Sequence, residues 1–290
     1  MTPNLRIHPR TTSAPQAYAY PSFLPLHPTN STTTSTMSSQ PLRIAVLECD
    51  TPVDKVKAEL GGYGNIFETL LSSGADLLAK ETGTRVPLDI RIFNVVNDEI
   101  YPTLDEIDAV LLTGSKYNSF DNSPWILKLV EFTRKLLTEQ ERVKVIGICF
   151  GHQIVGRALG SKVDRSDKGW EVSVTPMQLT EKGRDIFGVE SGDMYLHQMH
   201  QDIVYEYPKD VEHLAYSPKC AVQGMYQKGK LITVQGHPEF SNFITSAILD
   251  VRHDAGVLID DVYNDAMSRV GNKHDGVVAV KAFLKFVLEG

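Results

Sequence analysis

Cys149 stands in a sequence context that favours nucleophilic chemistry. The apolar, β-type run Val143 to Ile148 leads directly into it, glycines occupy positions 147 and 151, and a helical pattern follows. A strand that turns sharply into a helix, with a nucleophile at the apex, is the layout of a nucleophile elbow. Glycines suit the tight turn because side chains there would collide with backbone, and a helix N-terminus favours thiolate over thiol. We therefore predict a nucleophile here rather than a buried structural cysteine.

A second candidate group is His237-Pro-Glu239, which follows a β-branched run ending at Gly236. In extended chain, residues two apart project to the same side, so the carboxylate can orient the imidazole. The imidazole can then carry the proton of a nucleophile. Alone, the motif also fits a histidine in a turn beside a solvated glutamate. Together with a cysteine at the end of another strand, it predicts a triad of Cys149, His237 and Glu239.

The two motifs together resemble those of a known family. Gly147-Ile-Cys-Phe-Gly-His-Gln153 and His237-Pro-Glu239 are similar to the elbow and late motif of the class I (triad-type) glutamine amidotransferase domain. The resemblance runs from about Leu42 to the C-terminus. The segments Gly61–Leu70 and Thr113–Ser115 point to the stand-alone, GMP-synthase-like members, which include plant γ-glutamyl peptidases and fungal relatives.

This resemblance implies roles for further residues. The backbone N–H groups of Ser115 and Phe150 correspond to the family's oxyanion hole. Positions that correspond to the substrate-binding part of the site are Gly114, Gln153, His200 and Asp202. Asp202 would engage a substrate ammonium, or else be a solvated loop carboxylate. The resemblance implies no cofactor, and glutamyl transfer through a thioester needs no metal.

The elements around these residues predict an α/β fold. Apolar strands at 42–48, 88–94, 107–113 and 143–148 alternate with helical patterns at 65–81 and 124–138. This alternation predicts a mostly parallel, doubly wound, flavodoxin-like open sheet with flanking helices. The strand-rich stretch after Gly160 predicts a small antiparallel layer in addition. Ligands of such sheets bind beyond the carboxyl ends of the strands, where Ser115 and Cys149 fall.

Composition narrows the class of protein. The 290 residues carry a net charge of −7, which argues against sequence-independent nucleic-acid binding. No apolar run is long enough to span a bilayer. The three cysteines form no CxxC pair, which suits a reducing, cytoplasmic compartment.

Residues 1–41 are rich in Ser, Thr and Pro and predict a disordered tail before a domain at 42–290. The tail's lack of acidic residues leaves mitochondrial targeting as an alternative.

Three functions remain open at this level. The first is a hydrolase that cleaves a γ-glutamyl amide or peptide bond of a small molecule through a thioester on Cys149. The second is a glutaminase subunit that supplies ammonia to a separate synthetase. The third is a catalytically silent regulatory relative. The joint presence of Cys149, His237 and Glu239 argues against the third, because a silent protein has no physical need for all of them.

Overall fold

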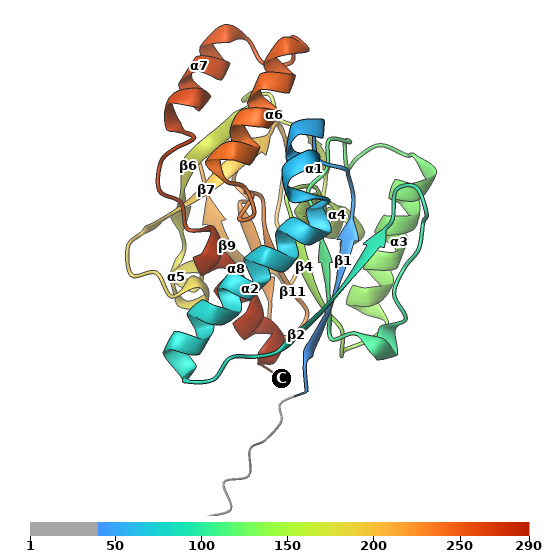
Figure 1. The fold of residues 1–290 in the computed structure, drawn as a ribbon. Coiled ribbons are helices and arrows are strands. Elements are labelled where there is room, and N and C mark those ends of the chain that lie inside the picture. Colours follow the sequence, from blue (N-terminus) through green and yellow to red (C-terminus); the bar gives the residue numbers. More distant parts are fainter. Residues whose placement is uncertain (1–39, 290) are drawn as a thin grey trace, which may run out of the picture. The chain divides into compact units, whose positions relative to one another are not determined.

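A nine-stranded mixed sheet with helices on both faces forms the fold, in a computed structural model that describes residues 40–289 (Figure 1). The predicted tail therefore lies, apart from residues 40 and 41, outside the described residues. In chain order the elements are β1 (Leu42–Glu48), α1 (Asp54–Leu60), α2 (Tyr63–Thr82), β2 (Leu88–Asn94), η1 (Leu104–Glu106), β3 (Ala109–Leu112), α3 (Pro124–Thr138), β4 (Lys144–Ile148), α4 (Phe150–Ala158), β5 (Val163–Arg165), β6 (Glu171–Leu179), α5 (Glu181–Phe187), β7 (Asp193–His200), β8 (Asp202–Val204), β9 (Glu212–Tyr216), β10 (Gly224–Gln227), β11 (Leu231–Val234), α6 (Asn242–Asp254), α7 (Asp260–Arg269) and α8 (Gly276–Leu288).

The strands follow the order β2-β1-β3-β4-β11-β10-β9-β6-β7 across the main sheet. The pairings from β2 to β11 are parallel. Every residue of β3, β4 and β11 is buried, as expected for strands covered on both faces. The alternation of apolar strands and helices thus gives the predicted parallel arrangement.

The strand-rich middle of the chain mostly extends this same sheet in antiparallel fashion. A turn at Lys228–Lys230 folds β10 back onto β11, with Gly224 opposite Val234, and β9, β6 and β7 continue the antiparallel part. In the part of the chain that the structure describes, only β5 and β8 form a separate, two-stranded antiparallel sheet. The predicted fold class, a mostly parallel sheet with a small antiparallel addition, is confirmed, although that addition is smaller than the strand-rich stretch suggested.

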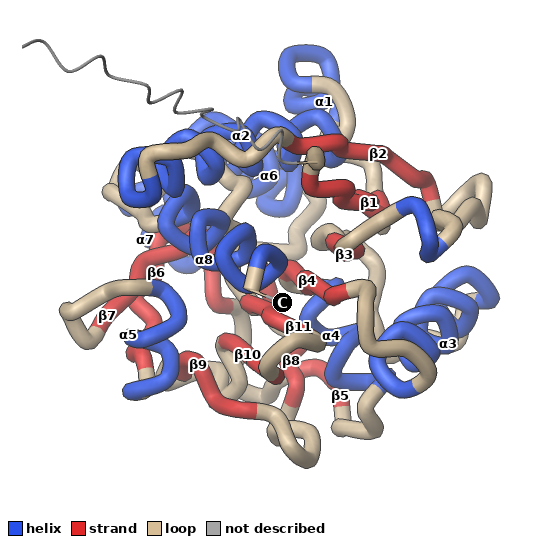
Figure 2. The backbone as a smooth tube through the Cα atoms, turned by 90° about the horizontal axis from the view of Figure 1, so that it is seen from below, coloured by secondary structure: helices blue, strands red, loops and turns tan. Residues whose placement is uncertain are grey.

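Helices cover both faces of the sheet. Figure 2 shows α2 and α8 on one side and α3 and α4 on the other. On the first side Phe67 of α2 and Phe283 of α8 belong to one apolar cluster, and on the second Trp125 of α3 and Ile154 of α4 belong to another. These two clusters fix the sheet as a rigid platform for the loops at its edge.

The carboxyl ends of three adjacent strands bring the candidate residues together. Gly114 and Ser115 follow β3, Cys149 follows β4, and His237 follows β11. The strand arrows point toward the edge of the sheet where α1 and α6 lie (Figure 1). Among the helices of residues 40–289, none combines the length and apolar character that crossing a membrane requires.

Candidate active site

Cys149 occupies a strained turn between β4 and α4. It is the N-cap residue of α4, it is buried, and its φ of 49° and ψ of −101° are uncommon for a residue with a Cβ atom. A Cβ at Gly147 would lie 2.9 Å from the carbonyl oxygen of Gly151, and a Cβ at Gly151 would overlap the carbonyl oxygen of Leu112. The turn therefore requires both glycines, and it places the sulfur at the N-terminus of α4.

The imidazole of His237 is held on several sides. Its Nδ1 lies 2.8 Å from Oε1 of Glu239, whose side chain is fully buried. The ring stacks on Phe240 with 3.9 Å between ring centroids and 12° between the planes. The backbone N–H of His237 donates to the carbonyl oxygen of His197 at 2.7 Å. These contacts fix the ring so that Nε2 remains available for another partner.

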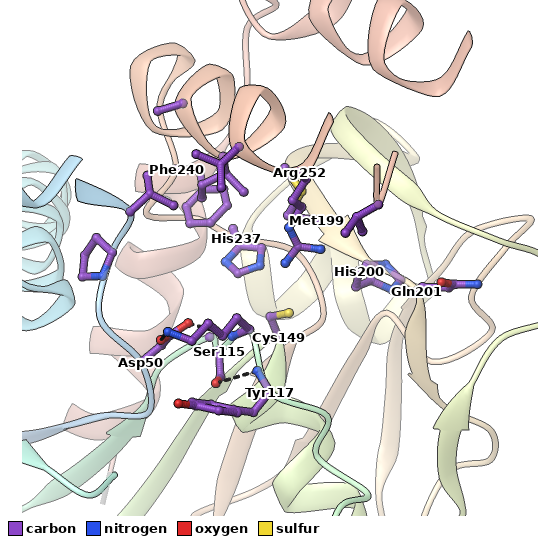
Figure 3. Close-up of a pocket in the computed structure, with 18 of the residues that line it drawn as sticks. Asp50, Ser115, Tyr117, Cys149, Met199, His200, Gln201, His237, Phe240 and Arg252 are labelled. Atoms are coloured by element: carbon purple, nitrogen blue, oxygen red, sulfur yellow. Dashed lines mark hydrogen bonds and ion pairs between the residues drawn. The ribbon is translucent and has the colours of Figure 1, made fainter. Parts of the chain in front are cut away.

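Electrostatics couple His237 to Cys149. Burial opposes the charged ring, but the negative charges of Cys149 and Glu239, together with hydrogen bonding to both, raise the pKa of His237 to about 10. A Cβ at Gly114 would lie 2.6 Å from Cε1 of His237 and 3.7 Å from Cβ of Cys149. The bare backbone of Gly114 thus leaves room for the two side chains beside each other (Figure 3).

A second buried histidine lies behind His237. His197 hydrogen-bonds to Oγ1 of Thr245 at 2.9 Å, and its ring packs edge-on against His274. Burial and the nearby imidazoles of His274 and His237 lower the pKa of His197 to about 3. His197 therefore stays neutral beside a charged His237. His200 lines the pocket, whereas His197 does not.

The turn after β3 offers hydrogen-bond donors beside Cys149. Oγ of Ser115 donates to the carbonyl oxygen of Cys49 at 2.8 Å and accepts from Tyr117 N–H at 3.1 Å (Figure 3). Among residues 40–289, no acceptor is bound to the backbone N–H of Ser115. Phe150 is the first residue of α4, where backbone N–H groups have no intrahelical acceptor. Both N–H groups are therefore available to an anionic oxygen.

The three remaining predicted binding residues lie in the pocket wall, with polar atoms already paired. Gln153 donates from Nε2 to the carbonyl oxygen of Asp202 at 2.8 Å. His200 contacts Glu171 at 3.1 Å and the same carbonyl oxygen at 3.2 Å. Asp202 pairs with Arg165 at 3.0 Å. These residues brace the wall, and any role in binding the substrate stays a prediction.

One pocket of about 930 Å³ is lined by the predicted nucleophile, by the imidazole of His237 and by the predicted binding residues. Its wall includes Cys149, His237 and Ser115. The rest of the wall comes in part from the loop between β1 and α1 and from residues of α6. This volume is near the upper end of the range typical for ligand sites, about 300–1,000 Å³. The pocket therefore has room for a substrate larger than a single amino acid.

Comparison with known proteins identifies the family of the chain. The family model for glutamine amidotransferase class-I matches residues 77–246. A glutamine amidotransferase-like protein of Schizosaccharomyces pombe is 34% identical over 249 residues, which span 85% of this chain and 98% of that protein. The chain belongs to the class I glutamine amidotransferase family. The resemblance predicted from the elbow and the His-Pro-Glu motif is confirmed.

Two further proteins, one relative and one solved structure, are similar to this chain. Gamma-glutamyl peptidase 3 of Arabidopsis thaliana is 34% identical over 210 residues, or 70% of this chain and 78% of that protein. A crystal structure of a glutamine amidotransferase from Thermotoga maritima superposes with a TM-score of 0.63 at 16% identity and covers 87% of this chain and 100% of that chain. At this identity the likeness speaks for the fold alone.

Several residues of this class I glutamine amidotransferase pocket were not predicted from the sequence. The pocket is also lined by Tyr63 of α2, by Trp170, which directly precedes β6, and by Arg252 of α6. For Arg252 a signal was present, because it follows the buried Ile244 and Ile248 at intervals of four residues. A charged residue on the apolar face of a helix is unusual and often faces a polar site. Nothing comparable distinguishes Tyr63 or Trp170 from ordinary core residues.

Proposed function

We propose that this protein is a cysteine hydrolase that cleaves γ-glutamyl amide or peptide bonds through a thioester on Cys149. The observation that carries the proposal is the buried His237, paired with Glu239 and raised in pKa by Cys149, beside a cysteine in a strained elbow. Such an arrangement favours a thiolate–imidazolium pair, which is the reactive form of a cysteine nucleophile.

In the first half of the reaction, the Cys149 thiolate attacks the γ-carbonyl carbon of the substrate. The tetrahedral oxyanion accepts hydrogen bonds from the N–H groups of Phe150 and Ser115. Removal of one such donor typically costs about 2.7–4 kcal/mol in the transition state. His237 donates its proton to the leaving nitrogen, the C–N bond breaks, and a γ-glutamyl thioester remains on Cys149.

In the second half, His237 is neutral and acts as a base. It takes a proton from a water molecule, whose oxygen attacks the thioester carbonyl carbon. The same backbone N–H groups receive the second oxyanion. The C–S bond breaks, the thiolate of Cys149 is restored, and a free γ-carboxylate leaves. Glu239 keeps the imidazole oriented through both halves and stabilises its charged form.

The pocket favours a γ-glutamyl compound with a sizeable leaving group over free glutamine. Its volume of about 930 Å³ exceeds what a single amino acid fills. The similarity to γ-glutamyl peptidases of Arabidopsis thaliana supports the same substrate class. The same chemistry acting on glutamine would release ammonia for a separate synthetase, and this second function makes a different experimental prediction.

A release assay distinguishes these functions. The full chain is incubated with glutamine, glutathione and γ-glutamyl dipeptides, and ammonia and free amino acid are measured separately, with Cys149→Ala as the control. We expect release of the amino acid or peptide from γ-glutamyl peptides, and no release by the control. Ammonia from glutamine alone would support the glutaminase subunit instead. If no substrate is cleaved, the proposed activity is wrong and a regulatory role is favoured.

A further inference from the structure

Arg252 enters the pocket from the last turn of α6. Its side chain extends between His237 and His200, above Cys149 (Figure 3). The guanidinium lies over the ring of Trp170, with 4.8 Å from Cζ to the ring centroid, and the residue is half-buried. This stacking restricts the side chain and directs its planar fork into the pocket.

Within residues 40–289, the Arg252 guanidinium takes part in no hydrogen bond and no ion pair. Two other cations of the pocket, Lys116 and Arg165, do have carboxylate partners. Lys116 pairs with Asp50 at 2.9 Å, and Arg165 pairs with Asp202 at 3.0 Å. Lys55 is exposed to solvent at the rim. A partly buried cation without a hydrogen-bonded counter-ion is costly, so an anion bound directly to the guanidinium would stabilise it.

The charge environment of Arg252 involves the reactive cysteine directly. Burial lowers the pKa of Arg252, and the negative charge of Cys149 is the largest influence in the opposite direction, followed by Tyr63 and Asp50. A guanidinium remains protonated under these conditions. An anionic group of a molecule that reacts at Cys149 therefore falls within the field of a fixed positive charge.

We propose that Arg252 binds a carboxylate of the substrate that reacts at Cys149. A guanidinium fork matches a carboxylate in two parallel hydrogen bonds, which gives orientation as well as affinity. The identity of the substrate rests on the proposed function. A γ-glutamyl peptide offers two carboxylates, the α-carboxylate of the glutamyl group and the terminal carboxylate of the leaving group. Either one would satisfy Arg252, and the experiments below separate them.

Alkylation of Cys149 tests the carboxylate preference without any assumption about the reaction. Iodoacetate carries a carboxylate and iodoacetamide does not, so the ratio of their rate constants reports attraction of an anion to the thiol. We expect Arg252→Gln to lower this ratio about tenfold. Lys55→Gln is the matched control, because it removes an exposed positive charge at the same pocket, and we expect a change below about twofold. If Arg252→Gln slows both reagents equally, the arginine acts on the thiolate and the proposal is wrong.

Hydrolysis kinetics then identify which carboxylate is bound. γ-Glutamyl-p-nitroanilide has only the α-carboxylate, whereas γ-glutamylglycine has a second one on the leaving group. A raised KM in Arg252→Gln for both substrates assigns the α-carboxylate, and a raised KM for the dipeptide alone assigns the leaving group. Partial recovery in Arg252→Lys supports either assignment. An unchanged KM for both would overturn the proposal. If the natural chain cleaves neither substrate, the proposed function fails, and the alkylation ratio still decides the role of Arg252.

Discussion

Gly114 and His237 are in direct contact, since a Cβ at position 114 would lie 2.6 Å from Cε1 of the imidazole. Alanine at this position would push the ring away from Cys149. We expect Gly114→Ala to lower kcat about 10²-fold, the effect typical of a displacement of about 1 Å in an active site. The free energy of unfolding should also fall, because the buried ring must shift from its contacts with Glu239 and Phe240 to accommodate the methyl. Steady-state kinetics and thermal melting measure the two effects.

The matched control for this substitution is Gly192→Ala, because a Cβ there would meet no atom within 4 Å. This variant should keep both its activity and its melting temperature. Equal activity of Gly114→Ala and Gly192→Ala would show that the position of the His237 ring does not limit the reaction.

The pH dependence of the reaction follows from the raised pKa of His237. Cys149 and Glu239 hold this pKa at about 10 against the effect of burial, so the ring stays protonated at neutral pH and loses its proton as the pH rises through about 10. Proton donation to the leaving nitrogen is lost in the same range. We therefore expect the alkaline limb of kcat/KM near pH 10 rather than near the ordinary histidine value of about 6.5.

Glu239→Gln removes one of the two negative charges that raise this pKa. The alkaline limb should move to lower pH, and kcat should fall by about 10²-fold or more because the ring loses its orientation. A pH series of the variant and the natural chain with one γ-glutamyl substrate provides the measurement. An unmoved alkaline limb would mean that Glu239 does not control the charge of His237.

Backbone strain at Cys149 makes a prediction about stability. Its φ of 49° and ψ of −101° are readily adopted by glycine, whereas a Cβ makes them costly by about 1–3 kcal/mol. Cys149→Gly should therefore have a higher free energy of unfolding than Cys149→Ala by about 1 kcal/mol. Both variants should be inactive. Denaturant titration compares them, and a more stable alanine variant would contradict a strained elbow.

Much of this fold was predictable because local sequence patterns coincide with the elements. The strands at 42–48 and 88–94 and the helix at 124–138 have the predicted bounds. The motif residues were accessible for the same reason, since Cys149 directly follows β4 and His237 lies three residues after β11, and the sheet places these strands side by side. Their spatial closeness required only the rule that parallel strands share a carboxyl edge.

Other features depend on packing between distant segments, which sequence patterns do not encode. The short helix α1 was not predicted separately, and the strand before His237 ends earlier than expected, at Val234. Arg252 reaches the pocket only because α6 packs across the carboxyl edge of the sheet. The pairing of Gln153 with the carbonyl oxygen of Asp202 is likewise a tertiary contact, so the sequence could not show that this amide is already occupied.

Covalent labelling tests most directly whether Cys149 is the nucleophile. Burial raises the pKa of the thiols of Cys49 and Cys220 to about 12 each, so both should remain unreactive at neutral pH. The full chain is treated with a diazoketone analogue of glutamine, and the adduct is located by intact-mass and peptide-mapping mass spectrometry. We predict one adduct, on Cys149, and none in Cys149→Ala. An adduct on Cys49 or Cys220, or undiminished labelling of the variant, would contradict the assignment of the active site.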